Sequence, residues 1–407
     1  MTLRQGIGDE KRPGRHWLTA ERLRAYPQIL LVVFGLATLG YVLASEGLQD
    51  PLGKPLGTYF SPFHAGARLA LDGEAAAIYD PERLLAAQQT AIPGTDDVFL
   101  WPLPPVLLLL LLPFGLLPYV PGLIAWLAFG FAGYALSLSR ALTDRTGVWA
   151  ALAFPGAIVC ALNSQTGLLA VALLVGALGQ LERRPLSAGL LLGLAGFRPE
   201  FAVLGCLALA AGARWRALAA TLATLAALLL ICFAAFGAAP WRAYLDSFPW
   251  LAEVLAEGWL PWFKLVSVYG SARLLGLSTT PAVALQAIVA ILTLAALVWA
   301  WRRPTAVELK GAVLACAALL VSPLTFYYDL VLLAPALLWL AEDGQRRGWR
   351  PWEREILAAA WALPLIASPL AQATALPLAL LAVVVLLWSL LRRIHGGGRG
   401  RETPAAA

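Results

Sequence analysis

The side chains of this sequence that can do chemistry are carboxylates beside long apolar runs, with a few cations nearby. Asp50 follows the first apolar run in QDPLG, and Asp329 opens another in FYYDLVLLAPALLWL. A carboxylate within a bilayer is costly unless a partner or a water-filled cavity stabilises it, so Asp329 predicts a functional or network role. Arg198 in FRPE and Lys264 in PWFK provide cations. Together, such groups can deprotonate a hydroxyl group and neutralise a leaving phosphate, as group transfer from a lipid-linked donor requires.

Motifs for several other chemistries are absent from the sequence. It contains no HExxH, CxxC, GxxxxGK[ST], GxSxG or helix-opening GxGxxG, and its three histidines are His16, His64 and His395. The sequence therefore lacks the catalytic or nucleotide-binding motifs of a metallopeptidase, a nucleotide-driven pump and a serine hydrolase. The four cysteines stand in apolar runs, where a thiol behaves as a small hydrophobic side chain.

The composition is that of an integral membrane protein. Hydrophobic residues make up 60% of the 407 residues and charged residues 13%, against about 25% charged residues in soluble domains. A spanning helix needs about 20 apolar residues, which predicts an all-α bundle of about ten to twelve spans. The net charge of +6 comes without a basic block interleaved with aromatic residues, so we expect no nucleic-acid partner. The candidate spans are 28–45, 101–117, 121–139, 149–162, 166–181, 187–211, 217–236, 282–301, 310–323, 326–341, 356–371 and 375–391.

The distribution of charge predicts how the bundle is oriented. Segment 46–100 carries eight acidic and three basic residues and is expected outside. Both termini are expected in the cytoplasm of a bacterium, with 1–27 a basic tail, 28–392 the membrane domain and 393–407 a disordered tail. A cleaved signal peptide is the alternative for the N-terminus, but further spans follow it here. Arginine-rich turns, expected in the cytoplasm, are 182–185, 214–216, 301–304, 342–354 and 390–401.

Two of the candidate spans conflict with simple alternation across the membrane. If 101–117 crossed fully, the basic segments 139–145 and 182–185 would lie outside, against the charge rule. The proline-rich start WPLPPV and the end PFGLLPY favour a broken or re-entrant helix instead. Segment 187–211 is interrupted in the same way at FRPE.

Two long segments, 46–100 and about 237–281, do not have the composition of spans. In the first, Phe60, Phe63 and Ala67 recur at helical spacing, and Asp80 stands where it can cap a second helix. These features predict short amphipathic helices on the membrane surface. The second segment is rich in Trp and Tyr, which suit the membrane interface and also suit a surface that holds a prenyl chain or a sugar ring.

Several segments occur in an order that is similar to a known family. They are PLGTYFSPFHAGARLALDGEAAAIYDPERLLAAQQ, FLWPLPPVLLLLLLPFGLLPY, LNSQTGLLAVALL, RRPLSAGLLLGLAGFRPEFAVL, PWFKLVSVYGSARLLG and SPLTFYYDLVLLAPALLWL. In this order, over residues 28–392, the chain resembles glycosyltransferase family 87, the polyprenol-phosphate-mannose-dependent members of the C-type membrane glycosyltransferases.

The resemblance implies a fold and a reaction. The fold is a C-type helical bundle with a catalytic aspartate just beyond the first helix. The reaction moves a hexose, with mannose the first candidate, from a polyprenyl-phosphate sugar to a lipid or glycan acceptor on the non-cytoplasmic face of the bilayer. The lipid-linked donor is a co-substrate, and the resemblance implies no cofactor, no nucleotide sugar and no metal site.

The chain departs from the family pattern at several positions. Tyr59 stands where relatives carry the acid, Ser164 interrupts a Gly-Gln-Asn pattern, and Arg198 replaces a lysine. A phenol with an ordinary pKa of about 10 is a poor general base at neutral pH. Asp50 is therefore the alternative base, although QDPLG also suits a turn acid.

Transferred residue by residue, the resemblance and the chemistry give a candidate site. Two alternatives stay open within it: Arg198 can instead pair with Glu200 across a broken helix, and Lys264 can be an interfacial lysine without a function. The candidate site comprises Asp50 and Asp329 as catalytic residues, Arg198 and Lys264 as ligands of the donor phosphate, and Tyr59, His64, Asn163, Gln165 and Tyr328 as substrate-lining residues.

Two other function classes remain open. A catalytically degenerate relative that binds or translocates a lipid-linked sugar is favoured by Tyr59, because the acid is lost there. An ion-coupled transporter would need matching broken helices in two halves, and the sequence shows no clear internal repeat.

Overall fold

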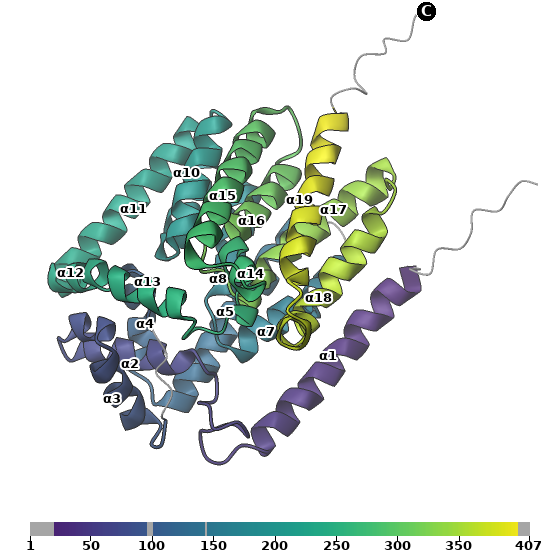
Figure 1. Cartoon of the computed structure of the whole chain (residues 1–407). Helices are drawn as coiled ribbons and strands as arrows, with labels where there is room; N and C mark the ends of the chain where they lie inside the picture. The colour runs from purple at the N-terminus through teal and green to yellow at the C-terminus, as the bar shows by residue number, and fades with distance from the viewer. Residues whose placement is uncertain (1–19, 96–100, 143–144, 398–407) are drawn as a thin grey trace, which may run out of the picture.

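The computed structural model describes residues 20–95, 101–142 and 145–397, and within these ranges the chain is helical with only isolated bridges between extended residues (Figure 1). This confirms the predicted all-α fold. Among the described residues, six helices are long and apolar enough to cross a membrane. They are α1 (Ala20–Leu43), α5 (Tyr119–Ala141), α11 (Trp215–Phe236), α15 (Thr279–Arg302), α18 (Glu353–Thr374) and α19 (Leu378–Gly397).

The remaining expected spans are shorter or divided. The predicted break within 101–117 takes the form of α4 (Val106–Gly115), whose ten residues reach about 15 Å, half the thickness of a bilayer core. Pro155 divides the expected span 149–162 into two helices. The shorter helices in the other expected spans are α6 (Arg145–Leu152), α7 (Pro155–Leu162), α8 (Gly167–Gln180), α16 (Val307–Val321), η4 (Tyr327–Leu332) and α17 (Leu333–Arg347).

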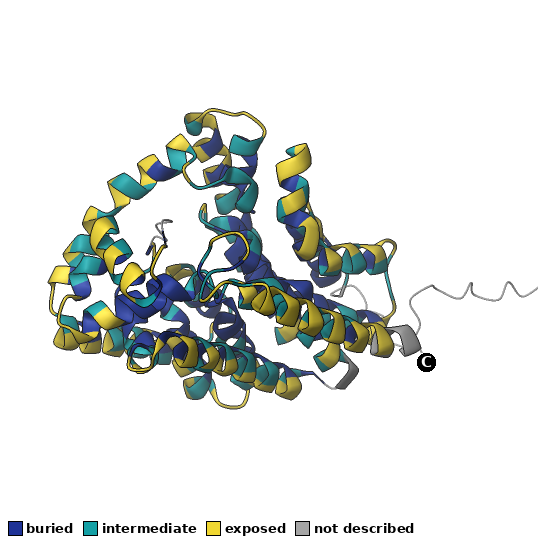
Figure 2. Ribbon diagram, turned by 90° about the horizontal axis from the view of Figure 1, so that it is seen from below, coloured by how far each residue is buried: buried dark blue, intermediate teal, exposed yellow. Residues whose placement is uncertain are grey.

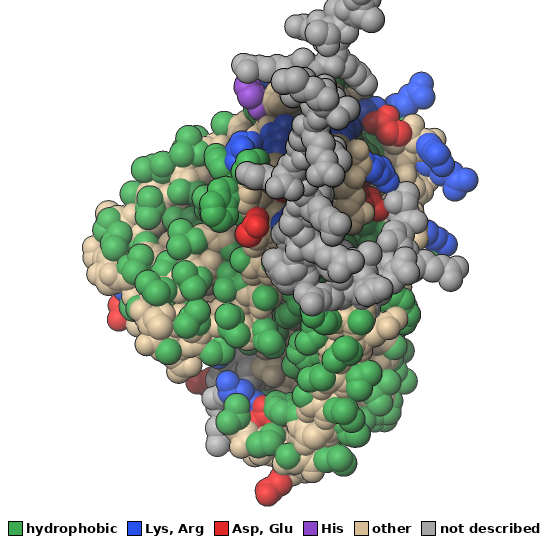
Figure 3. Space-filling view, turned by 90° about the vertical axis from the view of Figure 1, so that its right-hand side faces the viewer, with side chains coloured by type: hydrophobic (Ala, Val, Ile, Leu, Met, Phe, Trp, Pro, Cys, Tyr) green, Lys and Arg blue, Asp and Glu red, His purple; other side chains and the backbone are tan. Residues whose placement is uncertain are grey.

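The outer surface of the bundle is apolar, as a lipid-facing surface must be. Figure 2 shows buried residues gathered inside the bundle and exposed residues along its outer helices. On α1, Val32 and Leu36 are more than half exposed, and the helix lies at the edge of the molecule (Figure 1). Figure 3 shows hydrophobic side chains over the middle of one face and Lys and Arg gathered toward its upper end. These features support placement in a bilayer.

The predicted interruption at FRPE is present. α9 (Pro185–Leu194) passes through the short η2 (Ala195–Phe197), and α10 (Pro199–Ala211) begins at the proline, which cannot continue a helix. Gly189 and Gly193 let α9 lie close to α11, since a Cβ on Gly189 would come within 2.3 Å of the Ala217 oxygen. This close packing fixes the position of the break and of Arg198 within it.

The first non-spanning segment forms α2 (Phe60–Leu71), η1 (Ala75–Tyr79) and α3 (Pro81–Ala91), the last capped by Asp80 as expected. α2 is more deeply buried than a helix lying on a surface, because it packs against α4 and α3. The turn before it needs glycine: Gly57 has φ +78° and lies against Leu123. Residues 96–100, with the acidic pair Asp96 and Asp97, lie outside the described residues.

The second non-spanning segment forms α12 (Ala239–Asp246), α13 (Phe248–Glu257), η3 (Trp262–Lys264) and α14 (Val268–Leu274). α12 packs against η1 of the first segment, and Tyr79 and Tyr244 lie with ring centroids 5.5 Å apart. The two segments therefore lie side by side, whereas the arginine-rich ends of α15 and α19 lie at the other end of the bundle (Figure 1). Near the expected tails 1–27 and 393–407, α1 begins at Ala20 and α19 continues to Gly397, while 1–19 and 398–407 lie outside the described residues.

A buried ion network joins the last three helices. Arg393 of α19, 5% exposed, donates to Glu353 of α18 at 2.8 Å and to Asp343 of α17 at 2.5 Å. Removal of one partner of a buried pair leaves an uncompensated charge.

We therefore expect Glu353→Ala to lower the free energy of unfolding by about 3–5 kcal/mol. Thermal unfolding of the purified protein in detergent measures the effect. Glu355→Ala, at an exposed position of the same helix, is the matched control and should change the melting temperature little. If Glu353→Ala and Glu355→Ala had the same melting temperature, the network would contribute no stability.

Candidate active site

A cavity of about 770 Å³ lies where the two non-spanning segments meet the interrupted helices. Residues from α10, α13, η4 and the turn before α2 contribute to its wall. It brings together six of the residues predicted from the sequence, which are Tyr59, Gln165, Arg198, Lys264, Tyr328 and Asp329.

Three charged residues form an ion network in the cavity wall. The Arg198 Nη1 donates to Asp329 Oδ1 at 2.7 Å, and its Nε donates to Glu200 Oε1 at 2.7 Å. The Arg198 and Asp329 side chains are 11% and 3% exposed, whereas that of Glu200 is 17% exposed. One cation therefore serves two carboxylates, and Glu200 offers the more accessible carboxylate.

Local sequence explains how these groups are positioned. Pro199 starts α10, so Arg198 is held in an extended conformation at the break. Asp329 lies in the first turn of η4 and accepts from the Phe326 N–H at 2.9 Å. Its other oxygen faces Arg198, so the buried carboxylate has a hydrogen-bond donor on each side.

Tyr59 lies in the wall at the position where the family pattern has an acid. Its ring meets that of Tyr328 edge-on, with centroids 5.3 Å apart. Burial raises the pKa of the Tyr59 phenol to about 12. The phenol is thus protonated throughout the neutral range, so it can donate a hydrogen bond to a ligand but cannot act as a base.

Asn163 supports this wall from behind and is not among the cavity-lining residues. Its Oδ1 accepts from the Tyr327 hydroxyl at 2.9 Å, its Nδ2 donates to the Val159 oxygen at 2.8 Å, and its main-chain oxygen accepts from the Tyr59 N–H at 3.3 Å. Asn163 therefore joins the end of α7 to η4 and to the turn that carries Tyr59. This is a positioning role rather than the predicted substrate-lining one.

Asp50 also lies outside the cavity wall. It is 6% exposed, and its Oδ1 accepts from the main-chain N–H groups of Leu52 and Lys54, both at 2.8 Å. Its Oδ2 accepts from the Tyr41 hydroxyl. These bonds organise the QDPLG turn, so the geometry gives the predicted base role of Asp50 no support.

His64 is likewise placed in the core rather than in the cavity. It is 6% exposed, its Nε2 lies 2.9 Å from the Leu117 oxygen, and its ring packs against Phe60 and Tyr119. Burial lowers the pKa of His64. A neutral imidazole between α2 and the end of α4 is a packing residue, because α2 turns this face inward.

Sequence reasoning missed several residues that line the cavity. Glu200 was considered only as a partner of Arg198, although its position just after the helix-breaking proline was a signal. Lys54 also lines the cavity and adds a second cation to Lys264. Its ammonium group has no carboxylate within 4.0 Å among the residues that the structure describes. The apolar part of the wall adds Phe248, Leu251 and Leu255 to Tyr244 and Trp259, which belong to the aromatic segment that the sequence suggested for a prenyl chain or a sugar ring.

Comparison with known proteins gives one family match. Residues 101–323, more than half of the chain, match the family model of glycosyltransferase family 87. This range includes Arg198, Glu200, Lys264 and the aromatic wall of α12 and α13. Neither the curated proteins nor the solved structures that were searched gave a match. The chain belongs to glycosyltransferase family 87, a family of membrane glycosyltransferases.

Proposed function

We propose that the protein transfers a hexose, with mannose the first candidate, from a polyprenyl-phosphate sugar to a lipid or glycan acceptor. The observation that carries the proposal is the cavity itself, which combines the accessible Glu200 carboxylate, two lysines and an apolar aromatic wall. The cavity lies beside the two non-spanning segments, which we place on the non-cytoplasmic side because the first is acidic and the opposite end of the bundle is rich in arginine.

The donor fits the cavity in two parts. The apolar side chains of α12 and α13 suit the first isoprene units of a lipid that enters from the bilayer. Lys264 and Lys54 suit the phosphate. Arg198 suits it less than the sequence predicted, because two carboxylates already share its charge.

The carboxylate of Glu200 is the group that we assign as the base. It accepts the proton of the acceptor hydroxyl, whose oxygen forms a bond to the anomeric carbon of the sugar. The bond between that carbon and the phosphate oxygen breaks, and the electron pair leaves with the phosphate, whose charge the lysines neutralise. Arg198 and Asp329 hold Glu200 in place.

Replacement of Tyr59 distinguishes a ligand-binding phenol from a base. Because the phenol stays protonated, we expect Tyr59→Phe to keep transfer within about tenfold of the wild type, through loss of one hydrogen bond. Initial rates at several donor concentrations measure this, and the loss should appear in KM. A loss of kcat as large as that of Glu200→Gln would contradict our assignment.

The proposal is tested with the purified protein in nanodiscs. The protein is incubated with a radiolabelled polyprenyl-phosphate hexose and a lipid extract of its own host, and the label is followed into product. Transfer that depends on the protein supports the proposal. Binding of donor without turnover, across several sugars and acceptors, would favour the second candidate, a degenerate relative that binds lipid-linked sugars, which Tyr59 suggests.

A further inference from the structure

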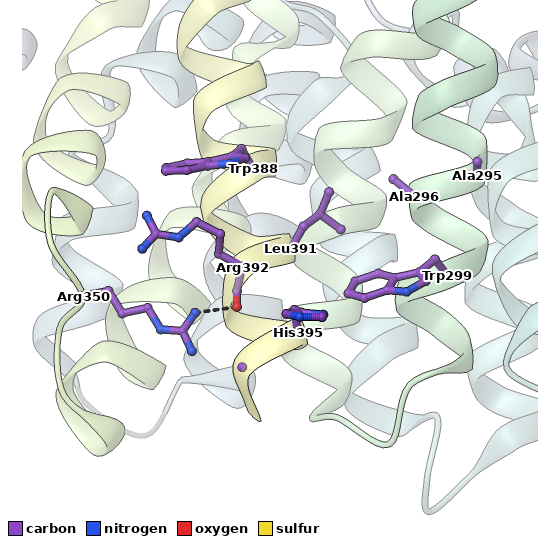
Figure 4. A pocket seen from close by; sticks show the side chains of 9 residues that line it. Ala295, Ala296, Trp299, Arg350, Trp388, Leu391, Arg392 and His395 are labelled. Atoms are coloured by element: carbon purple, nitrogen blue, oxygen red, sulfur yellow. Dashed lines mark hydrogen bonds between the residues drawn. The ribbon is translucent and has the colours of Figure 1, made fainter. Parts of the chain in front are cut away.

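A second cavity, of about 660 Å³, lies between α15 and α19, near the C-terminal end of α19 and away from α12 and α13 (Figures 1 and 4). Both helices are candidate membrane spans, and both pack against α16, which lies between them. Figure 4 shows Ala295 and Ala296 toward one end of this groove and basic side chains toward the other. The residues lining it are Ala295, Ala296, Trp299, Arg350, Trp388, Leu391, Arg392, His395 and Gly396.

The basic end of the groove carries two arginines whose guanidinium groups form no ion pair with the carboxylates that the structure describes. Arg350 donates to the main-chain oxygen of Arg392, and the Arg392 guanidinium lies 4.4 Å from the centroid of the Trp388 ring. Among the side chains that the structure describes, neither guanidinium forms an ion pair within 4.0 Å, although the Arg350 main-chain N–H donates to Glu353 Oε2 at 2.8 Å. The neighbouring Arg393 differs, because Asp343 and Glu353 neutralise it.

The apolar part of the groove is open to the outer surface of the bundle. Trp388 is 52% exposed although it belongs to a candidate span, and the Trp299 ring stacks on His395 with centroids 6.3 Å apart. Ala295 and Ala296 leave room on α15 that larger side chains would fill. Tryptophans flank the boundary between the apolar part and the arginines, as they do at a membrane interface.

From this arrangement we propose that the groove binds an anionic phospholipid from the adjacent leaflet. Its phosphate lies against Arg350 and Arg392, and one acyl chain follows Ala295, Ala296 and Leu391. Arginine binds phosphate through charge-assisted hydrogen bonds, and basic pockets between spanning helices favour anionic head groups. A zwitterionic lipid carries its own cation and gains less from the two arginines.

Native mass spectrometry of the full chain in detergent tests the proposal. Phosphatidylglycerol and phosphatidylcholine with the same acyl chains are titrated, and the bound fraction is measured. We expect preferential binding of phosphatidylglycerol, weakened about fivefold in Arg392→Gln and about thirtyfold when Arg350→Gln is added. Equal binding of the two lipids, or unchanged binding in the double variant, would overturn the proposal.

Three further measurements distinguish binding of the lipid in the groove from non-specific attraction of an anionic lipid to positive charge. Ala296→Trp keeps every charge but fills the groove, so it should also lose phosphatidylglycerol. Arg346→Gln combined with Arg347→Gln removes two exposed charges of α17 outside the groove and should leave binding unchanged. Glycerol phosphate, which lacks acyl chains, should not compete. Unchanged binding in Ala296→Trp, lost binding in the Arg346 and Arg347 double variant, or full competition by glycerol phosphate would contradict a phospholipid site. Melting curves without lipid verify that each variant is folded.

Discussion

Replacement of Arg198 by Gln is expected to abolish sugar transfer and to destabilise the protein. The guanidinium is the shared partner of Asp329 and Glu200, and the Asp329 side chain is 3% exposed. Without the cation, a buried carboxylate stays unpaired, at a cost of about 3–5 kcal/mol. Displacement of the Glu200 carboxylate alone is expected to lower the rate of sugar transfer about a hundredfold. Transfer of radiolabel in nanodiscs and thermal unfolding measure the two effects.

Arg198→Lys is the matched control for this prediction. A lysine keeps the charge and is the residue that the family pattern carries at this position, but it reaches the two carboxylates less well than the forked guanidinium. We expect this variant to fold and to keep a measurable part of the activity. Wild-type rates in Arg198→Gln, in protein shown to be folded, would contradict the role of the ion network.

Replacement of Glu200 by Gln is expected to lower the rate of transfer by about a hundredfold to ten-thousandfold, the range found on loss of a general base. The amide has nearly the same shape, so the donor should bind as it does to the wild type. The loss should therefore appear in kcat rather than in KM. Binding of the donor without acceptor, measured beside the initial rate, separates the two.

The two aspartates nominated from the sequence provide the comparison. Asp50→Asn should keep most of the activity, because Asp50 bonds to its own turn and to Tyr41 outside the cavity wall. Asp329→Asn weakens the attachment of Arg198 and should lower both stability and rate. An inactive Asp50→Asn beside an active Glu200→Gln would return the base to Asp50.

The sequence was sufficient to predict the architecture. Apolar runs of a known minimum length gave the helical membrane fold, and prolines gave the interruption at FRPE and the short helix in 101–117. Both signals are local, since length and φ restriction act within one segment. Two long non-spanning segments were also predicted, with short helices expected in the first of them.

Which residues form the site depends on contacts between distant parts of the chain, and no local sequence pattern contains such contacts. Arg198 and Asp329 are 131 residues apart, and the family pattern rather than their spacing brought them together. The pattern also placed His64 in the site, but α2 packs that face into the core. Asp50 was nominated from its position after the first helix, while the hydrogen bonds that engage it come from the fold of the turn. Glu200 was overlooked because an ion pair with Arg198 was sufficient to account for a carboxylate at that position.

The central claim, that a lipid-linked sugar binds in the cavity beside α13, is tested most directly with a photoreactive polyprenyl-phosphate hexose. After illumination in nanodiscs, the labelled peptides are identified by mass spectrometry. The account predicts labels on residues 248–260, and their loss in Ala252→Trp, which narrows the cavity. Labels confined to other surfaces, such as the groove between α15 and α19, or labels unchanged in Ala252→Trp, would contradict it.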